Sequence, residues 1–349
     1  MNILNNINVF RRRLMHNITK NIGKSHFPKN VDLTTKVEIK KVLICRPNHR
    51  LGNLLLITPL VQEVIATFPE CKIDLLVQGG LAPILFENYK NVENIIQLPK
   101  KPFKNLIKYI KGFLSIKKQR YDLVINAVIG SSSGKLYTLI ATSKYKVFGE
   151  DNEDIKIRFK DHEHIAKYQA YSFRNYLSKL GFENNNIPVI GLNLKLNSLE
   201  LETGKIIVKE LVNNEKKTIC LFTHATGDKC YSEPWWMEFY ESLKIEFPNY
   251  NIIEVLPIEN ISKIAFKAPS FYSKDIRELG SVIANTEIFI GADSGIMHLA
   301  SASQTPTVGL FSRANQNSYA PFGNGSSAIN TNTSDIEDWI EGINRTLKR

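Results

Sequence analysis

Four residues whose side chains suit an anion-binding site stand close together in the last quarter of the chain: Asp293, Ser294, Gly295 and His298. Asp and Ser are favoured residues at the start of a helix, and Gly lets the backbone approach a ligand closely. The first turn of a helix leaves N–H groups unpaired and carries a partial positive charge. The spacing predicts a site for a phosphate or diphosphate, with an ordinary capped helix above a packed His298 as the alternative interpretation.

The residues around this turn predict the elements that hold it. The apolar run at 288–290 indicates a buried strand, and apolar residues after the turn recur at helical spacing. Thr305-Pro306 ends the helical pattern, and the run at 307–310 predicts the next buried strand. A strand, a tight turn, a helix and a second strand in this order are typical of parallel strands.

Three stretches of the sequence resemble glycosyltransferase family 9, the ADP-heptose:lipopolysaccharide heptosyltransferases. GADSGIMHLASASQTPTVGLF resembles the family's D-S/T-G-x-x-H-L-A-A motif. VLICRPNHRLGNLLLITPLVQEVIATFPECKIDLLV resembles its opening strand, R-x-G-D loop and first helix. HATGDKCYSEPWW is a weaker match, in which Lys229 resembles a donor-site lysine. The matches lie in the family's order and at its distances, and together they cover most of residues 40–325.

The expected fold is α/β, because strand-like apolar runs alternate with helical patterns in both halves of the chain. The resemblance implies the GT-B architecture, with two doubly wound Rossmann-like domains facing a central cleft. We place an N-terminal, acceptor-side domain at 36–190 and a C-terminal, nucleotide-sugar-binding domain at 191–330. The remaining residues, 331–349, predict a C-terminal helix, which in the family commonly packs back on the first domain.

Residues 1–35 form a separate basic segment. Apolar residues recur in it at helical spacing, and Arg11, Arg12 and Arg13 stand side by side. A basic amphipathic helix can lie in a membrane interface, so we expect this segment to contact the inner-membrane surface. A helix docked on the protein body, or a frayed tail, is the alternative.

Composition narrows the classes of protein to consider. The formal net charge of +11 favours anionic partners. No nucleic-acid-binding motif is present, so anionic lipid and a nucleotide-sugar are the better candidates. No run of 18 apolar residues predicts a spanning helix, and no secretion signal is expected. Cys45 and Cys220 lie within strand-like runs, which fits core thiols in a reducing compartment. We therefore expect a cytoplasmic protein, peripherally associated with the inner face of the cytoplasmic membrane.

The resemblance implies an inverting, metal-independent transfer of a heptose from ADP-heptose to the inner core of lipopolysaccharide, with no cofactor. Glu259 stands near an acidic family residue that binds the adenosine ribose, and Glu254 is the alternative. The turn at Ser132 lies where a loop after a strand would meet the cleft, although a plain capped loop is as good an interpretation. The expected acceptor-binding residues are Arg50, Gly52 and Ser132. The expected donor-binding residues are Thr223, His224, Lys229, Glu259, Asp293, Ser294, Gly295 and His298.

One departure from the family affects catalysis. The family's loop reads R-x-G-D, and its aspartate is regarded as the general base, whereas this chain has Asn53 at that place. An amide has no basic lone pair near neutral pH and cannot accept the proton. Three explanations are open. Asn53 orients the acceptor while His49 or an acceptor group serves as the base, or the acceptor differs, or the protein is only weakly active. We favour the first, because His49 lies in the same loop.

Two other functions are compatible with the sequence. One is a related GT-B transferase with a different nucleotide-sugar or surface-glycan acceptor, because fold does not determine substrate. The other is a catalytically silent partner that binds a nucleotide-sugar, which Asn53 keeps open. A Rossmann dehydrogenase is disfavoured, because no G-x-G-x-x-G follows the first strand.

Overall fold

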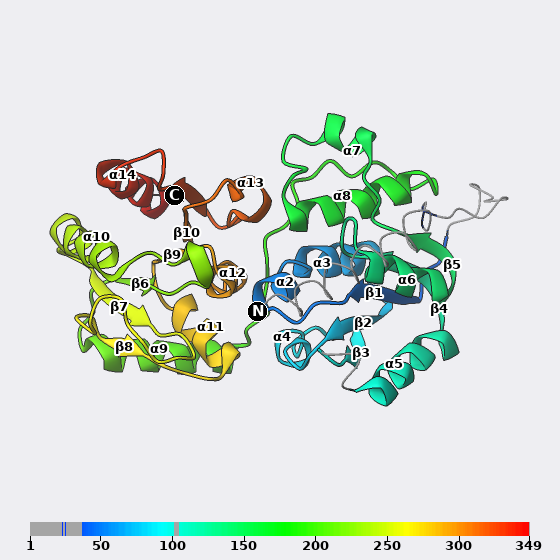
Figure 1. Cartoon of the computed structure of the whole chain (residues 1–349), viewed down its shortest axis with the longest axis horizontal. Helices are drawn as coiled ribbons and strands as arrows, with labels where there is room; N and C mark the ends of the chain where they lie inside the picture. Colours follow the sequence, from blue (N-terminus) through cyan, green and yellow to red (C-terminus); the bar gives the residue numbers. More distant parts are fainter. Residues whose placement is uncertain (1–22, 24, 26–36, 101–104, 349) are drawn as a thin grey trace, which may run out of the picture. The chain divides into compact units, whose positions relative to one another are not determined.

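The computed structural model describes residues 23, 25, 37–100 and 105–348, which form two compact units (Figure 1). Of the described residues, one unit contains those up to His49 together with 60–83 and 89–189, and the other contains 50–59, 84–88 and 190–348. The predicted amphipathic segment at 1–35 lies outside the described residues, apart from Gly23 and Ser25. No helix in the described ranges has the length and apolarity needed to cross a membrane.

The first unit is built on a parallel sheet. Its strands are β1 (Lys41–Arg46), β2 (Lys72–Gln78), β3 (Val92–Leu98), β4 (Arg120–Asn126) and β5 (Thr142–Val147). They lie in the order β3-β2-β1-β4-β5, so the chain leaves β1 toward one edge and then crosses to the other. This is the doubly wound arrangement. β1 reads as a continuous apolar run because parallel strands are covered on both faces.

Helices connect these strands. The helices are α3 (Thr58–Thr67), α4 (Ala82–Leu85), α5 (Leu106–Lys118), α6 (Ser132–Ile140), α7 (Glu153–Arg158) and α8 (Ile165–Ser178). The sequence at 54–68 is broadly helical, and Pro59 within it indicates a kink or a later helix start; the structure has α2 (Leu51–Leu55) followed by α3. The Thr58 hydroxyl donates to the Leu55 carbonyl at 2.8 Å, and Pro59 takes the second position of α3, where its missing N–H costs nothing.

The second unit repeats the doubly wound pattern with a larger parallel sheet. Its strands are β6 (Thr218–Phe222), β7 (Asn251–Val255), β8 (Ser270–Phe271), β9 (Ile288–Ala292), β10 (Thr307–Phe311) and β11 (Ser327–Asn330). The order is β11-β10-β9-β6-β7-β8. All five residues of β6, β9 and β10 are buried, so these central strands are covered on both faces.

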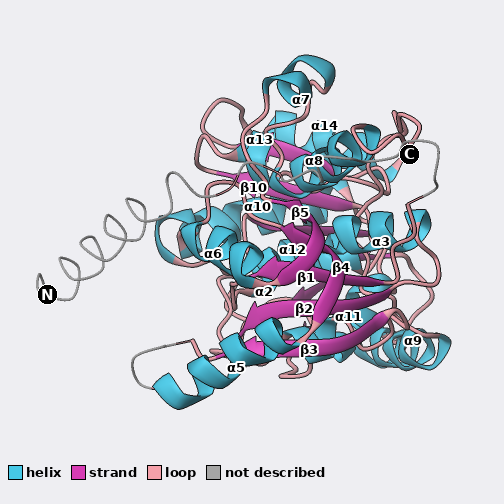
Figure 2. Cartoon of the chain, turned by 90° about the vertical axis from the view of Figure 1, so that its right-hand side faces the viewer, coloured by secondary structure: helices cyan, strands magenta, loops and turns pink. Residues whose placement is uncertain are grey.

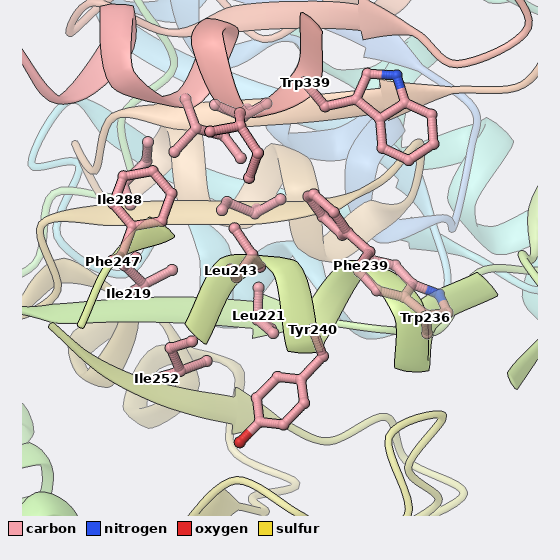
Figure 3. Close-up of a cluster of buried hydrophobic side chains, with 14 of the residues drawn as sticks. Ile219, Leu221, Trp236, Phe239, Tyr240, Leu243, Phe247, Ile252, Ile288 and Trp339 are labelled. Atoms are coloured by element: carbon pink, nitrogen blue, oxygen red, sulfur yellow. The ribbon is translucent and has the colours of Figure 1, made fainter. Parts of the chain in front are cut away.

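The helices of the second unit enclose an aromatic core. They are α2, α9 (Ser198–Val212), the 3₁₀ turn η2 (Gly227–Lys229), α10 (Glu233–Glu246), α11 (Ile276–Ala284), α12 (Gly295–Ala302), α13 (Gln316–Tyr319) and α14 (Ile336–Leu347). Trp236 and Phe239 of α10 pack over Leu221 and Ile288 of the sheet (Figure 3). The predicted α/β class with two doubly wound halves is therefore confirmed in each unit.

The last helix packs within the second unit. α14 begins with a reciprocal capping box between Asp335 and Asp338. Its buried side chains Trp339, Ile340 and Ile343 join the same core as α10, and the Trp339 indole N–H donates to the Ser334 hydroxyl at 2.8 Å. The apolar face of this helix packs against α10, β10 and β11 of its own unit. The expected packing of α14 on the first domain stays a prediction.

Candidate functional site

Three loops meet at the carboxyl ends of neighbouring strands in the second unit. β9 lies between β10 and β6 and pairs in parallel with both. The loops that follow β6, β9 and β10 therefore emerge at one edge of the sheet, where doubly wound folds bind ligands. The motif at 293–298 follows β9, and Lys229 follows β6 on η2. We expected the motif at 293–298 and Lys229 to belong to one site. The strand order places both at the same edge of the second unit's sheet.

The turn after β9 begins α12 as predicted, with one difference in its capping. Ser294 is the N-cap, and its hydroxyl accepts from the Met297 N–H at 3.2 Å. Asp293 does not cap the helix. Its backbone N–H donates to the Leu310 carbonyl of β10 at 3.1 Å, which continues the sheet by one residue. The side chain of Asp293 is therefore available for another role.

Asp293 carries a buried carboxylate that is paired twice. It is 6 % exposed, and its Oδ2 accepts from Lys229 Nζ at 2.7 Å and from Asn315 Nδ2 at 2.8 Å. A buried carboxylate without such partners would be costly. The pair also holds the Lys229 ammonium beside the first turn of α12. A cation and a helix N-terminus together are suited to an anion.

His298 lies under this turn as a buried neutral base. Burial lowers its pKa to about 4, the Asp293 carboxylate opposes this shift, and the Lys229 ammonium adds to it. The imidazole is therefore uncharged near neutral pH and can bind a phosphate only as a neutral hydrogen-bonding group. Its ring lies 6.4 Å from the ring of Tyr319 on α13.

The loop with the Asn53 substitution packs on the same helix. A β-carbon added at Gly52 would lie 2.6 Å from His298 Cδ2, and one at Gly295 would lie 3.3 Å from Leu51 Cβ. The two glycines therefore let α2 and α12 approach closely. This contact brings the sequence RLGN at 50–53 to the DSGIMH motif, about 240 residues later in the chain. Arg50 is exposed at the start of α2, and Asn53 is half-buried within it.

Four predicted residues lie at or after the carboxyl ends of β6 and β7, and some of them are buried while others are exposed. The Thr223 hydroxyl donates to Glu254 Oε1 at 2.5 Å, and the Ser262 hydroxyl donates to Glu254 Oε2 at 2.6 Å. Glu254 is fully buried, and burial raises the pKa of its carboxyl. Of the two glutamates considered for the ribose, only Glu259 is exposed. His224 Nδ1 is buried and has no hydrogen-bond partner among the residues that the structure describes.

Two predicted residues belong to the first unit. His49 follows β1, and its Cβ lies near Gly79, where an added β-carbon would come within 3.2 Å. Ser132 is the first residue of α6, and Ser131 caps that helix by accepting from the Gly134 N–H at 3.1 Å. Ser132 is half-buried. The structure thus places His49 in the loop that follows β1, and Ser132 at the first position of the helix that follows β4.

Asn315, the second partner of Asp293, is not predicted by the sequence. It follows β10 in a loop with no periodicity or motif, and only the pairing of β9 with β10 brings it to Asp293. Arg313 of the same loop forms an ion pair with Asp228 of η2 and so links two of the three loops. Within the described ranges, no group of three His, Cys, Asp or Glu side chains is placed to hold a metal ion.

The sequence around this site is similar to that of known proteins. The model of glycosyltransferase family 9 (heptosyltransferase) matches residues 273–338, which run from α11 through the DSG turn to α14. Lipopolysaccharide heptosyltransferase 3 of Escherichia coli is 23 % identical over 300 residues, covering 78 % of this chain and 84 % of that protein. The chain is therefore similar to glycosyltransferase family 9 through residues 273–338, and the relative that it matches over most of its length is a heptosyltransferase.

Solved structures of family 9 proteins share the fold of this chain. A family 9 glycosyltransferase from Veillonella parvula superposes with a TM-score of 0.69 at 16 % identity, covering 90 % of this chain and 99 % of that one. E. coli ADP-heptose lipopolysaccharide heptosyltransferase II superposes with a TM-score of 0.61 at 16 % identity, covering 89 % and 99 %. The heptosyltransferase WaaC of E. coli, solved with ADP, gives 0.62 at 14 % identity, covering 88 % and 99 %. The predicted GT-B class is therefore confirmed.

Proposed function

We propose that this protein is a family 9 glycosyltransferase that moves a heptose from ADP-heptose to an inner-core sugar of lipopolysaccharide, with inversion at the transferred carbon. The observation that carries the proposal is the Lys229–Asp293 pair at the first turn of α12. A leaving nucleoside diphosphate needs positive charge, and here a lysine and a helix N-terminus supply it together. The E. coli enzyme solved with ADP has the same fold, which supports ADP as the nucleotide.

The donor site in this proposal lies in the second unit. Lys229 exchanges its contact with Asp293 for the diphosphate, and backbone N–H groups at Ser294 and Gly295 donate to phosphate oxygens. Asp293 then binds a hydroxyl of the sugar, because an unpaired carboxylate beside a diphosphate would repel it. His298 supports the turn as a neutral base. Thr223 and His224 border the site, and exposed Glu259 is the candidate for the ribose.

The acceptor binds at Arg50, Gly52 and Ser132 in this proposal, at the starts of the helices α2 and α6 that follow β1 and β4. Its hydroxyl oxygen attacks the anomeric carbon of the heptose from the face opposite to ADP, the bond to the diphosphate breaks, and the configuration inverts. The hydroxyl proton passes to His49, because the Asn53 amide cannot take it. Asn53 holds the acceptor oxygen by hydrogen bonding. No metal or cofactor takes part.

We also propose where in the cell the enzyme works. The acceptor is anchored in lipid, so the enzyme works at the inner face of the cytoplasmic membrane as a peripheral protein. The predicted amphipathic segment at 1–35 is one candidate for this contact. We propose that the N-terminal domain at 36–190 is the acceptor side and the C-terminal domain at 191–330 the donor side. Arg50 and Gly52 belong to the same compact unit as the donor residues, whereas Ser132 belongs to the other unit.

The test is a transfer assay with ADP-heptose and a deacylated inner-core acceptor, followed by ADP release and product mass. We expect a product heavier by one heptose, and we expect its loss in the double variant Lys229→Ala/Asp293→Ala. The matched control is Lys217→Ala/Glu287→Ala, which removes an ion pair of 3.1 Å on the surface of the same unit. Competition by UDP or GDP in place of ADP would overturn the donor assignment. Donor binding without any product would favour a different acceptor or a silent partner.

A further inference from the structure

Helix α5 of the first unit is docked by one face only. Tyr109, Phe113 and Ile116 turn toward the core, and the helix lies along β3 (Figure 2). Gly112 brings it close, since a β-carbon there would lie 2.7 Å from Leu98 Cδ2. The Tyr109 and Tyr137 hydroxyls are hydrogen-bonded at 2.5 Å, which ties α5 to α6. The helix is therefore held firmly, and its outward face is presented in a defined orientation.

The outward face carries an apolar stripe. Ile107, Ile110 and Leu114 are 74 %, 46 % and 46 % exposed. At about 100° per residue, positions i, i+3 and i+7 fall within an arc of about 60°. Single exposed apolar residues are ordinary on a protein surface, whereas three in one line along a helix mark an interaction site.

Lysines border this stripe on both sides. Lys111 and Lys118 lie on one side of it and Lys117 on the other, by the same helical angles, and all three are exposed together with Lys108. No Asp or Glu occurs in the sequence between Glu93 and Asp122. The α5 surface thus combines apolar side chains with charge of a single sign.

We propose that the α5 surface docks on an anionic phospholipid bilayer, with Ile107, Ile110 and Leu114 in the acyl boundary and the lysines on lipid phosphates. This combination of an apolar stripe flanked by lysines is what an interfacial helix requires. A second copy of the chain fits less well, because a symmetric contact would face lysines against lysines. A nucleic acid would use the lysines and leave the stripe exposed. The proposal needs neither the donor nor the acceptor of the proposed reaction, so the two can fail separately.

The test measures partition of the full-length protein onto vesicles by co-sedimentation. The vesicles contain phosphatidylcholine alone or with 30 % phosphatidylglycerol. The apolar variant is Ile107→Ser/Ile110→Ser/Leu114→Ser, and the charge variant changes Lys108, Lys111, Lys117 and Lys118 to Gln. The control is Leu199→Ser/Ile206→Ser/Ile245→Ser, which alters apolar residues at least as exposed as those of the stripe, on helices with charges of both signs.

The proteins are also measured with Arg11, Arg12 and Arg13 changed to Gln, so that binding by the segment 1–35 cannot conceal the effect. We expect the apolar variant to bind anionic vesicles at least tenfold more weakly, the charge variant to lose about fivefold per lysine, and the control to change less than twofold. The proposal would be overturned if, with Arg11, Arg12 and Arg13 changed to Gln, the apolar variant bound anionic vesicles as tightly as the protein with an unaltered α5 surface. A loss confined to the charge variant, or a wild-type dimer that the apolar variant does not form, would also overturn it.

Discussion

Gly52 and His298 touch across the contact between α2 and α12. The missing side chain of Gly52 makes room for the imidazole, since a β-carbon there would lie 2.6 Å from Cδ2. His298 is only 4 % exposed. The sequence RLGN at 50–53 and the DSG turn therefore pack closely on each other. Gly52 leaves room for His298, and Gly295 leaves room for Leu51.

The first prediction concerns this fit. Gly52→Ala should destabilise the contact between α2 and α12 by about 1–3 kcal/mol, as overpacking of a buried site does. Hydrogen–deuterium exchange should become faster in peptides covering 295–302, with thermal unfolding shifted downward. Gly80→Ala is the control, because its nearest neighbour would lie 4.0 Å away in open space. Equal protection of α12 in both variants would contradict the close approach.

Much of this fold follows from patterns in the sequence. The strands β6, β9 and β10 are short, fully buried and apolar, and the DSG turn between a strand and a helix is visible in the residues alone. The pairing of those strands is not visible, because it is determined by contacts between residues far apart in the chain. Asn315 therefore escaped prediction as a member of the site, although it lies beside Asp293. Glu254 was named only as the alternative for the ribose, and its buried contact with Thr223 could not be predicted. The split of the first helix at Thr58 depends on one local hydrogen bond.

The second prediction concerns the nucleotide. Lys229→Ala should weaken ADP binding about 10- to 100-fold, since it removes a charge-assisted contact and leaves the Asp293 carboxylate beside the diphosphate. Titration calorimetry with ADP measures this, with Lys217→Ala as an exposed control. Asp293→Asn should leave ADP binding unchanged or tighter and weaken ADP-heptose, because only the sugar uses the carboxylate. Equal effects of Asp293→Asn on both ligands would contradict that role.

The third prediction is a pH dependence of stability caused by His298. The fold lowers the pKa of His298 to about 4, so the unfolded chain binds a proton at higher pH than the folded chain does. Stability is therefore unaffected above pH 6.5 and falls as the pH drops from about 6.5 to 4. The wild type should lose about 2–3 kcal/mol more than His298→Gln between pH 7.5 and 4.5. Urea unfolding at several pH values measures the difference, and parallel curves would show that the imidazole is not buried as a neutral base.

The fourth prediction concerns Glu254, whose contribution to stability changes with pH in the direction opposite to that of His298. Burial raises the pKa of this carboxyl, so the unfolded chain releases its proton at lower pH than the folded chain does. The wild type should therefore lose stability relative to Glu254→Gln as the pH rises above about 4.5, until the raised pKa is passed. Glu254→Ala should be destabilised throughout, because Thr223 and Ser262 lose their acceptor. A difference between wild type and Glu254→Gln that does not vary with pH would contradict the buried acid.

The last prediction concerns the base that replaces the missing aspartate. If His49 takes the acceptor proton, His49→Ala should lower kcat about 10²-fold or more and leave the KM for the donor nearly unchanged. Asn53→Asp supplies a carboxylate from α2, so the double variant His49→Ala/Asn53→Asp should recover most of the lost rate. Single-turnover assays separate the chemical step from donor binding. An unchanged rate in His49→Ala would exclude His49, and an increase in Asn53→Asp alone would then identify Asn53 as the reason for weak activity.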